Sequence, residues 1–171
     1  MNAFRIRLAD LVPGKNRVHL EAPASAVGLD PEVWVSPIDL DLELDRQGDQ
    51  IAVRGTGRTR VEEDCSRCMR HFESPVVFQW SAFADRAALG RPGEDEELDE
   101  YVIRHDGRWL DLDAEVREQA ILARPMQSLC RPDCAGLCPR CGADRNQVAC
   151  NCREPEPQGS AFRRIRPESQ A

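Results

Sequence analysis

Residues 38–45 read Ile38-Asp39-Leu40-Asp41-Leu42-Glu43-Leu44-Asp45. Every second side chain is a large aliphatic group, and every side chain between them is acidic. This period of two is typical of a β-strand that buries one face and exposes the other. Gly48 and Asp49 follow within residues 46–50 and are turn formers, so the segment predicts a strand that leads into a β-hairpin.

The second strand of this hairpin is predicted over residues 51–61, which alternate in the same way. Its mainly apolar face is made of Ile51, Val53, Thr59 and Val61. Its polar face is made of Arg54, Thr56, Arg58 and Arg60. Gly55 and Gly57 fall on the apolar face, where a missing side chain indicates either a bulge or the close approach of another group.

A third strand is predicted over residues 72–84, where Val76, Phe78 and Trp80 supply β-branched and aromatic bulk after Pro75. Three consecutive strands with short connections form an antiparallel meander. Residues 4–8 alternate as well, and residues 33–35 read Val-Trp-Val before Pro37, so we expect one or two further strands in the same sheet.

One helix is predicted after a strand-like stretch over residues 101–104 and the turn signal Asp106-Gly107. Asp111 is a suitable N-cap, and Asp113 stands four residues before Arg117. The helix should run through residue 123 and end before Pro125. Its apolar stripe consists of Leu112, Val116, Ala120 and Ala123. The expected fold class is therefore α+β, with this helix packed on the meander.

The length of 171 residues fits one domain with a small appendage. We expect a sheet and helix body over residues 1–126, a Cys-rich segment over 127–153 and a flexible tail over 154–171. An acidic, apolar-poor stretch over residues 86–100 predicts a solvated loop within the body. That loop has either no role or the role of an acidic arm that mimics phosphate toward a basic partner.

Eight cysteines form four close pairs: Cys65 and Cys68, Cys130 and Cys134, Cys138 and Cys141, Cys150 and Cys152. Clustered pairs in a chain without an export signal indicate metal binding more often than disulfides. Zinc prefers tetrahedral sulfur ligands, and a two-residue spacer lets both thiolates face one point. The segment from residue 130 onward has few large apolar residues, so something other than hydrophobic burial must order it.

The local quartet Cys138, Cys141, Cys150 and Cys152 is assigned to one zinc ion. Cys65 and Cys68 lie at the predicted hairpin tip and need two more ligands, and Cys130 and Cys134 are the pair that remains. We therefore predict two zinc ions with four Cys each. His71 is the alternative to one sulfur at the hairpin-tip site.

Thiol–disulfide exchange is the competing interpretation, because Cys-x-x-Cys also serves redox chemistry. Such a motif usually opens a helix in a βαβ unit, and the sequence around Cys65 shows none. Four sulfurs per ion leave no position for water, which argues against metal-assisted hydrolysis.

The residues together resemble the YceD-like family. The resemblance rests on the hairpin-tip Cys65-Ser-Arg-Cys68, on Asp111-Leu112 before the helix, and on residues 136–152, which read Gly-Leu-Cys-Pro-Arg-Cys-Gly with Asn146 and a final Cys-Asn-Cys. It spans residues 38–152. Asp144 stands where family members tend to carry Asn, and the tail lacks the expected Leu-bearing Asp-Pro-Arg ending.

The resemblance implies a role in accumulation of the large-subunit (23S) ribosomal RNA, with that RNA or its assembly intermediates, or ribosomal proteins, as partners. The whole chain has net charge −7, although residues 121–171 hold eight Arg against five Asp or Glu. Much of the Arg richness matches a coding bias, since Lys15 is the single Lys. Candidate phosphate contacts are Arg54, Arg58, Arg60, Arg140, Arg145, Arg163, Arg164 and Arg166.

We expect a non-enzymatic protein, because the sequence shows no Ser-His-Asp arrangement, phosphate loop or HExxH motif. The alternatives are a thiol-based redox sensor and an acidic adaptor that binds only a basic ribosomal protein. The sequence has no run of about 18 apolar residues, and its first ten residues mix Arg5 and Arg7 with Asp10. A cytoplasmic location without membrane attachment is expected.

Overall fold

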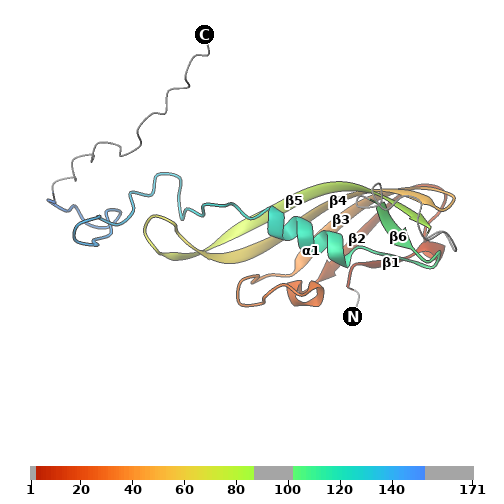
Figure 1. Ribbon diagram of the computed structural model, residues 1–171, viewed down its shortest axis with the longest axis horizontal. Coiled ribbons are helices and arrows are strands. Elements are labelled where there is room, and N and C mark those ends of the chain that lie inside the picture. The colour runs from red at the N-terminus through yellow and green to blue at the C-terminus, as the bar shows by residue number, and fades with distance from the viewer. Residues whose placement is uncertain (1–2, 87–101, 153–171) are drawn as a thin grey trace, which may run out of the picture.

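The computed structural model describes residues 3–86 and 102–152 and is built on a five-stranded sheet (Figure 1). Its strands lie in the order β2-β3-β4-β5-β6. They are β2 (Gly14–Ala22), β3 (Ile38–Gln47), β4 (Gln50–Asp64), β5 (His71–Arg86) and β6 (Val102–His105). The pairs β2–β3, β3–β4 and β4–β5 are antiparallel, whereas β6 runs parallel to β5. The fold is thus mostly antiparallel sheet with one helix.

The remaining elements lie around this sheet. A two-stranded antiparallel sheet joins β1 (Arg5–Arg7) to β7 (Trp109–Asp111). Two 3-10 turns, η1 (Leu8–Asp10) and η2 (Ala24–Val27), precede α1 (Asp113–Leu122). The helix contacts β5 and η2. Among the described residues, no helix is both long enough and apolar enough to cross a bilayer.

The predicted meander of β3, β4 and β5 is confirmed, and the alternation of its sequence matches the burial of its side chains. The aliphatic residues of β3 are buried, and its acidic residues lie on the other face. The β3–β4 turn contains Gly48, whose φ of 67° is a left-handed conformation that favours glycine. The strands are longer than predicted, and in Figure 1 the β4–β5 ribbon extends beyond the other strands toward the Cys-rich segment.

The two glycines of β4 allow a close approach and not a bulge. In register, Gly55 faces Trp80 and Gly57 faces Phe78 on β5. A Cβ atom at Gly55 would lie 2.0 Å from ring carbons of Trp80, and one at Gly57 would lie 2.1 Å from Phe78. The two rings cover the glycine backbone, with their centroids 5.9 Å apart. Any larger side chain at either position would displace a ring.

One of the two further strands was predicted with the wrong partner. Residues 5–7 do form a strand, but β1 pairs with β7 and not with the meander. Residues 33–35 contribute a single bridge, from Trp34 to Val61 of β4. The meander instead gains β2, which the sequence analysis did not predict. The strand-like stretch near residue 102 is confirmed as β6, and Asp106-Gly107 forms the predicted turn.

The helix has the predicted buried stripe of Leu112, Val116 and Ala120. Its N-cap is Leu112, one residue later than predicted, and Asp111 Oδ1 instead accepts the N–H of Asp113 at 3.1 Å. The Asp113 carboxylate accepts the backbone N–H groups of Ala3 and Phe4 at 3.2 and 2.7 Å. The guanidinium of Arg117 donates to the Gly28 carbonyl. The helix is therefore fixed to the N-terminal segment by these polar contacts.

The buried residues form two separate clusters. The larger one lies between the sheet, α1, η2 and the β1–β7 pair. The smaller consists of Cys65, Cys68 and Cys134, with Phe72, Leu129 and Cys130 around them. The body and the Cys-rich segment therefore have different sources of stability, although their predicted boundary at residues 126 and 127 stays a prediction. Apart from Arg86, the last residue of β5, the predicted acidic loop lies outside the described residues, and so does the tail over 154–171.

Candidate metal centre

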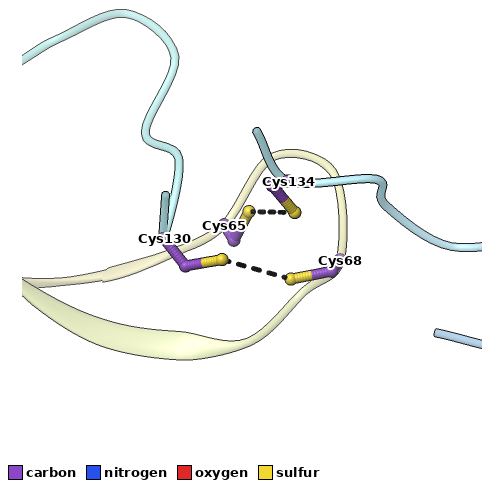
Figure 2. Close-up of side chains that lie close together, drawn as sticks. All are labelled: Cys65, Cys68, Cys130 and Cys134. Atoms are coloured by element: carbon purple, nitrogen blue, oxygen red, sulfur yellow. Dashed lines mark hydrogen bonds between the residues drawn. The ribbon is translucent and has the colours of Figure 1, made fainter. Parts of the chain in front are cut away.

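Four cysteine sulfurs from two distant parts of the chain meet at the β4–β5 hairpin tip. Cys65 and Cys68 come from the tip itself, and Cys130 and Cys134 come from the segment after α1. In Figure 2 the four side chains point toward one another. The Sγ atoms of Cys65 and Cys134 are 3.7 Å apart, as are those of Cys68 and Cys130. We call these four residues the first sulfur group.

The spacing of these sulfurs fits a tetrahedral metal ion and not a disulfide. Zinc–sulfur bonds of about 2.3 Å place tetrahedral sulfurs about 3.8 Å apart, whereas a disulfide needs about 2.05 Å. All four ligand atoms lie within 4.8 Å of one another, and all eight cysteines are free. His71 lies apart from the group, with its Nδ1 2.6 Å from Asp64 Oδ1.

The hairpin tip forms a knuckle that turns both of its sulfurs inward. The N–H of Cys65 donates to the Arg70 carbonyl, and the N–H of Met69 donates to the Cys65 carbonyl, both at 2.9 Å. Met69 follows the second cysteine with a φ of 58°, a left-handed conformation that is uncommon for residues other than glycine. Gly142 has the same place after Cys141, with a φ of 72°. The two Cys-x-x-Cys turns thus share one backbone shape.

Backbone contacts hold the C-terminal segment against this knuckle. The N–H of Ser66 donates to the Ser128 carbonyl at 2.8 Å, and the N–H of Leu137 donates to the Arg67 carbonyl at 2.9 Å. The Arg67 side chain donates to the Cys134 carbonyl at 2.9 Å. The segment therefore contacts the hairpin tip on both sides of Cys134.

The other four cysteines, Cys138, Cys141, Cys150 and Cys152, form the second sulfur group. Their sulfurs also lie within 4.8 Å of one another. Cys138 is buried, whereas Cys141 and Cys152 are exposed. The knuckle is closed by the Gly142 N–H, which donates to the Cys138 carbonyl, and by the Cys138 N–H, which donates to the Ala143 carbonyl. This group is local in sequence and more accessible to solvent than the first.

Each group contains one thiol whose acidity is increased. Backbone N–H groups, that of Cys130 foremost, lower the pKa of Cys65 to about 6. Those of Cys141 and Arg140 lower the pKa of Cys138 to about 6. Desolvation beside the other sulfurs raises the pKa of Cys130 to about 12. A cation arriving at either group would thus meet one thiolate already formed and would displace protons from the others.

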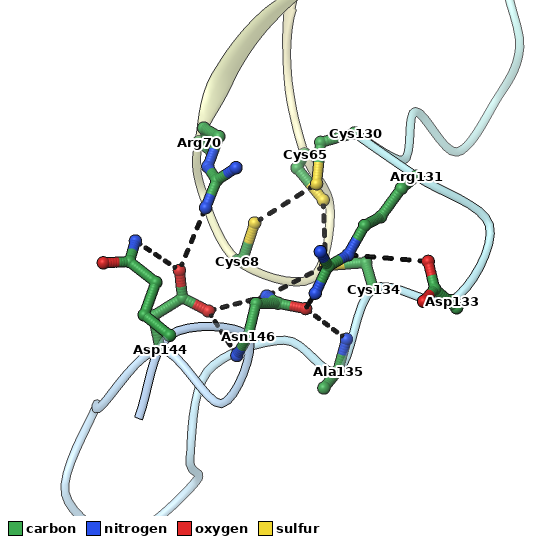
Figure 3. Close-up of polar contacts among 11 residues, drawn as sticks. Cys65, Cys68, Arg70, Cys130, Arg131, Asp133, Cys134, Ala135, Asp144 and Asn146 are labelled. Atoms are coloured by element: carbon green, nitrogen blue, oxygen red, sulfur yellow. Dashed lines mark hydrogen bonds and ion pairs between the residues drawn. The ribbon is translucent and has the colours of Figure 1, made fainter. Parts of the chain in front are cut away.

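A polar network lies between the two groups (Figure 3). The side chain of Asn146 contacts Cys134 of the first group, although Asn146 lies between Cys141 and Cys150 of the second group in sequence. Asp144 accepts hydrogen bonds from the backbone N–H of Asn146 at 2.9 Å and from its side chain. The sequence places Asn146 within the Cys-rich motif but does not predict this contact, which depends on how the segment folds.

A charge pair positions the chain as it leaves the helix. Glu63 of β4 has a side chain 4% exposed, and its Oε1 lies 3.3 Å from Arg124 Nη2. Ser74 donates to the other carboxylate oxygen at 2.9 Å. Arg124 also lies over the Trp34 ring, 6.0 Å from its centroid. These contacts fix the direction in which the chain continues from α1 to the hairpin tip.

Replacing Arg124 with Met should destabilise the protein by about 1–3 kcal/mol, because it leaves the buried Glu63 carboxylate with one hydrogen bond from Ser74. The loss should appear as a lower urea midpoint with an unchanged slope. Arg124→Lys retains a cation and should lose less. Equal midpoints for Arg124→Met and the parent would contradict this role of the pair.

The candidate phosphate-contacting arginines differ in their surroundings. Arg58 lies 2.7 Å from Asp41 and holds the pKa of that carboxyl below its usual value. Arg60 lies 3.0 Å from Glu73, and Arg54 stands opposite Glu43 in the β3–β4 register. In the Cys-rich segment, the backbone N–H of Arg140 donates to the Cys138 sulfur. The backbone N–H of Arg145 donates to the Gly136 carbonyl. Arg163, Arg164 and Arg166 lie outside the described residues.

An antiparallel sheet with one packed helix and a C-terminal pair of four-cysteine groups defines a class of small α+β protein with two candidate metal centres. The sequence model of the family described as large ribosomal RNA subunit accumulation protein YceD matches residues 53–164. The chain therefore belongs to this family. The matched residues include all eight cysteines of the two sulfur groups.

The chain is also similar to individual proteins. Uncharacterized proteins of Mycobacterium bovis and Mycobacterium tuberculosis are 30% identical over 138 residues, which cover 79% of this chain and 61% of theirs. The chain thus spans about three fifths of the length of these relatives. A chloroplastic protein of Arabidopsis thaliana, named large ribosomal RNA subunit accumulation protein YCED homolog 1, is 22% identical over 149 residues, covering 72% of this chain and 46% of its own. No solved structure matches the chain.

Proposed function

We propose that this protein is a non-enzymatic, cytoplasmic factor of ribosome biogenesis that supports accumulation of 23S ribosomal RNA, with two structural zinc ions. The observation that carries the proposal is the pair of four-sulfur groups, each within 4.8 Å, in a member of this family. The first and second sulfur groups would each hold one ion. Bound zinc would order the Cys-rich segment. It would not activate a water molecule, because four sulfurs complete its tetrahedral coordination.

The partner we propose is the large-subunit ribosomal RNA or one of its assembly intermediates. Phosphate contacts at Arg58 and Arg60 would have to displace the ion pairs with Asp41 and Glu73. This favours the Cys-rich segment, through the exposed Arg140, over the outer face of the sheet as the region that contacts RNA. No aromatic base-stacking motif accompanies these arginines in the sequence, so the contacts would recognise the RNA backbone and not its sequence.

The proposal is tested by combining zinc content with RNA levels. Purified under reducing conditions, the protein should contain about two equivalents of zinc and few reactive thiols before chelation, as two four-cysteine sites require. Cells lacking the protein should accumulate less 23S than 16S ribosomal RNA, and the wild-type chain, but not Cys134→Ser, should restore the balance. Ser66→Ala is the matched control, because its side chain is exposed and only its backbone contacts the segment. Normal 23S levels without the protein would contradict the proposal.

An acidic adaptor that binds a basic ribosomal protein is the second candidate. It is favoured by the row of carboxylates on the outer face of β3, at Asp39, Asp41, Glu43 and Asp45, of which Asp41 and Glu43 would have to exchange Arg58 and Arg17 for the partner. Crosslinking in cells followed by RNA sequencing separates the two candidates. The RNA-binding proposal predicts adducts to 23S ribosomal RNA, whereas an adaptor would give protein adducts alone. Freely reactive thiols in a metal-poor sample would instead favour a redox sensor.

A further inference from the structure

Asn146 uses its whole side-chain amide at the junction of the two sulfur groups. Its Nδ2 donates to Cys134 Sγ at 3.4 Å and to Asp144 Oδ1 at 2.6 Å. Its Oδ1 accepts the backbone N–H of Ala135 at 2.8 Å and Arg131 Nη2 at 2.7 Å. Figure 3 shows the amide between the Cys134 sulfur and the Asp144 carboxylate. A neutral donor is thus directed at a sulfur of the first sulfur group by a residue from the loop of the second.

Asp144 fixes the position of this amide. Its Oδ1 accepts the Asn146 backbone N–H, and this hydrogen bond foremost lowers the pKa of the Asp144 carboxyl. Its Oδ2 lies 3.5 Å from Arg70 Nη2 of the first knuckle. The carboxylate therefore links the loop around Asn146 to the hairpin tip as well as orienting the amide.

The loop that carries Asn146 has little hydrophobic burial of its own. It runs from Cys141 to Cys150, both in the second sulfur group, and Val148 within it is 53% exposed. Within it, the N–H groups of Gln147 and Val148 donate to the Asp144 carbonyl at 3.0 Å, and the Arg145 N–H ties the loop to the Gly136 carbonyl at 2.9 Å. Metal at the second group would fix both ends of this loop and so add to the contacts that hold Asn146 in place.

We propose that Asn146 couples the two metal centres, so that metal at the second sulfur group raises the affinity of the first. The inference rests on the proposed zinc sites. A hydrogen bond donated to a coordinating sulfur stabilises the charge on that ligand, and losing such an outer contact typically lowers metal affinity about 10–100-fold. Because linkage is reciprocal, metal at the first group raises the affinity of the second by the same factor.

The test is a double-mutant cycle on the full chain loaded with cadmium and titrated with a chelator. Each four-sulfur site gives its own cadmium NMR resonance, so the occupancy of each is followed separately. Cys141→Ser with Cys152→Ser removes the second site, and this change should lower first-site affinity about 10–100-fold. Asn146→Ala should cause a similar loss when the second site is intact and no further loss when it is removed.

Two further variants keep the result interpretable. Val148→Ala changes an exposed side chain in the same loop and should leave first-site affinity unchanged. Asn146→Asp keeps the acceptor for Ala135 and Arg131 but places a carboxylate against the sulfur, so it should lower first-site affinity more than Asn146→Ala. Circular dichroism of each variant verifies that the sheet is folded.

The possible failures are distinguishable. An Asn146→Ala loss of equal size with and without the second site, or no loss in either, would overturn the coupling while leaving both metal sites standing. Failure of cadmium and zinc to bind either sulfur group would overturn the metal proposal, and the coupling with it. Neither result depends on whether 23S ribosomal RNA accumulates, which the complementation experiment measures separately.

Discussion

Replacing Cys134 with Ser should detach residues 127–152 from the hairpin tip while the five-stranded sheet stays folded. Cys134 is 1% exposed, its sulfur lies 3.7 Å from Cys65, and its carbonyl accepts Arg67. A lost sulfur ligand should lower metal affinity by more than the roughly 10–100-fold typical of outer contacts. Structural zinc contributes about 10–16 kcal/mol in small zinc domains, and the few apolar residues around the sulfurs cannot replace it.

Limited trypsin digestion measures this detachment. The segment contains Arg140 and Arg145, and cleavage after them should accelerate strongly in Cys134→Ser and in the parent after chelation, whereas Arg131 precedes Pro132 and resists trypsin. Ser66→Ala should digest like the parent. Circular dichroism should report an intact sheet throughout, because the core of the body shares no buried residue with the sulfur cluster. Unchanged digestion after complete metal removal would show that the segment is ordered without metal.

The parts of the fold that the sequence predicted are those whose signal is local. The alternation of residues 38–45 specified β3 because aliphatic and acidic residues alternate without a break. Strand β2 was not predicted, because its inward positions include Gly14 and Asn16, and its inward Val18 and Leu20 are only half-buried. The parallel direction of β6 was not predicted either, since the sequence of a four-residue strand does not indicate the direction in which it pairs.

The grouping of the cysteines followed from chemistry rather than from local pattern. Four close pairs leave few ways to complete two tetrahedra, so assigning the nearest two pairs to one ion left Cys65 and Cys68 with Cys130 and Cys134. The outer contacts could not be predicted in this way. Asn146 reaches Cys134 only because the knuckles, the Arg67 contacts and the Asp144 carboxylate place the loop there.

The body and the sulfur groups have separate roles in this arrangement. No strand of the sheet carries a cysteine of either sulfur group, but the β4–β5 ribbon carries Cys65 and Cys68 at its tip, where the C-terminal segment returns. The position of this ribbon therefore determines where two of the four sulfurs of the first sulfur group lie. Within the ribbon, the Trp80 ring lies directly over the backbone of Gly55.

Replacing Gly55 with Val should destabilise the body by about 3 kcal/mol or more, because the first added carbon would lie 2.0 Å from the Trp80 ring. Valine is a better strand former than glycine, but that preference spans only about 1 kcal/mol. Trp80 is 9% exposed and packs beside Phe78, so its ring has little room to move away. The expected sign is therefore a loss, measured as a lower urea midpoint.

Two comparisons make this prediction specific to the ring contact. Thr56→Val adds a β-branched apolar side chain to the neighbouring position on the opposite face of β4, and it should leave the midpoint nearly unchanged. Trp80→Leu in the Gly55→Val background frees space above the strand and should recover part of the loss, although Trp80→Leu alone destabilises the protein. A Gly55→Val protein as stable as its parent would show that the Trp80 ring does not lie on the backbone of Gly55. The extension of the β4–β5 ribbon toward the first sulfur group would then need another source of rigidity.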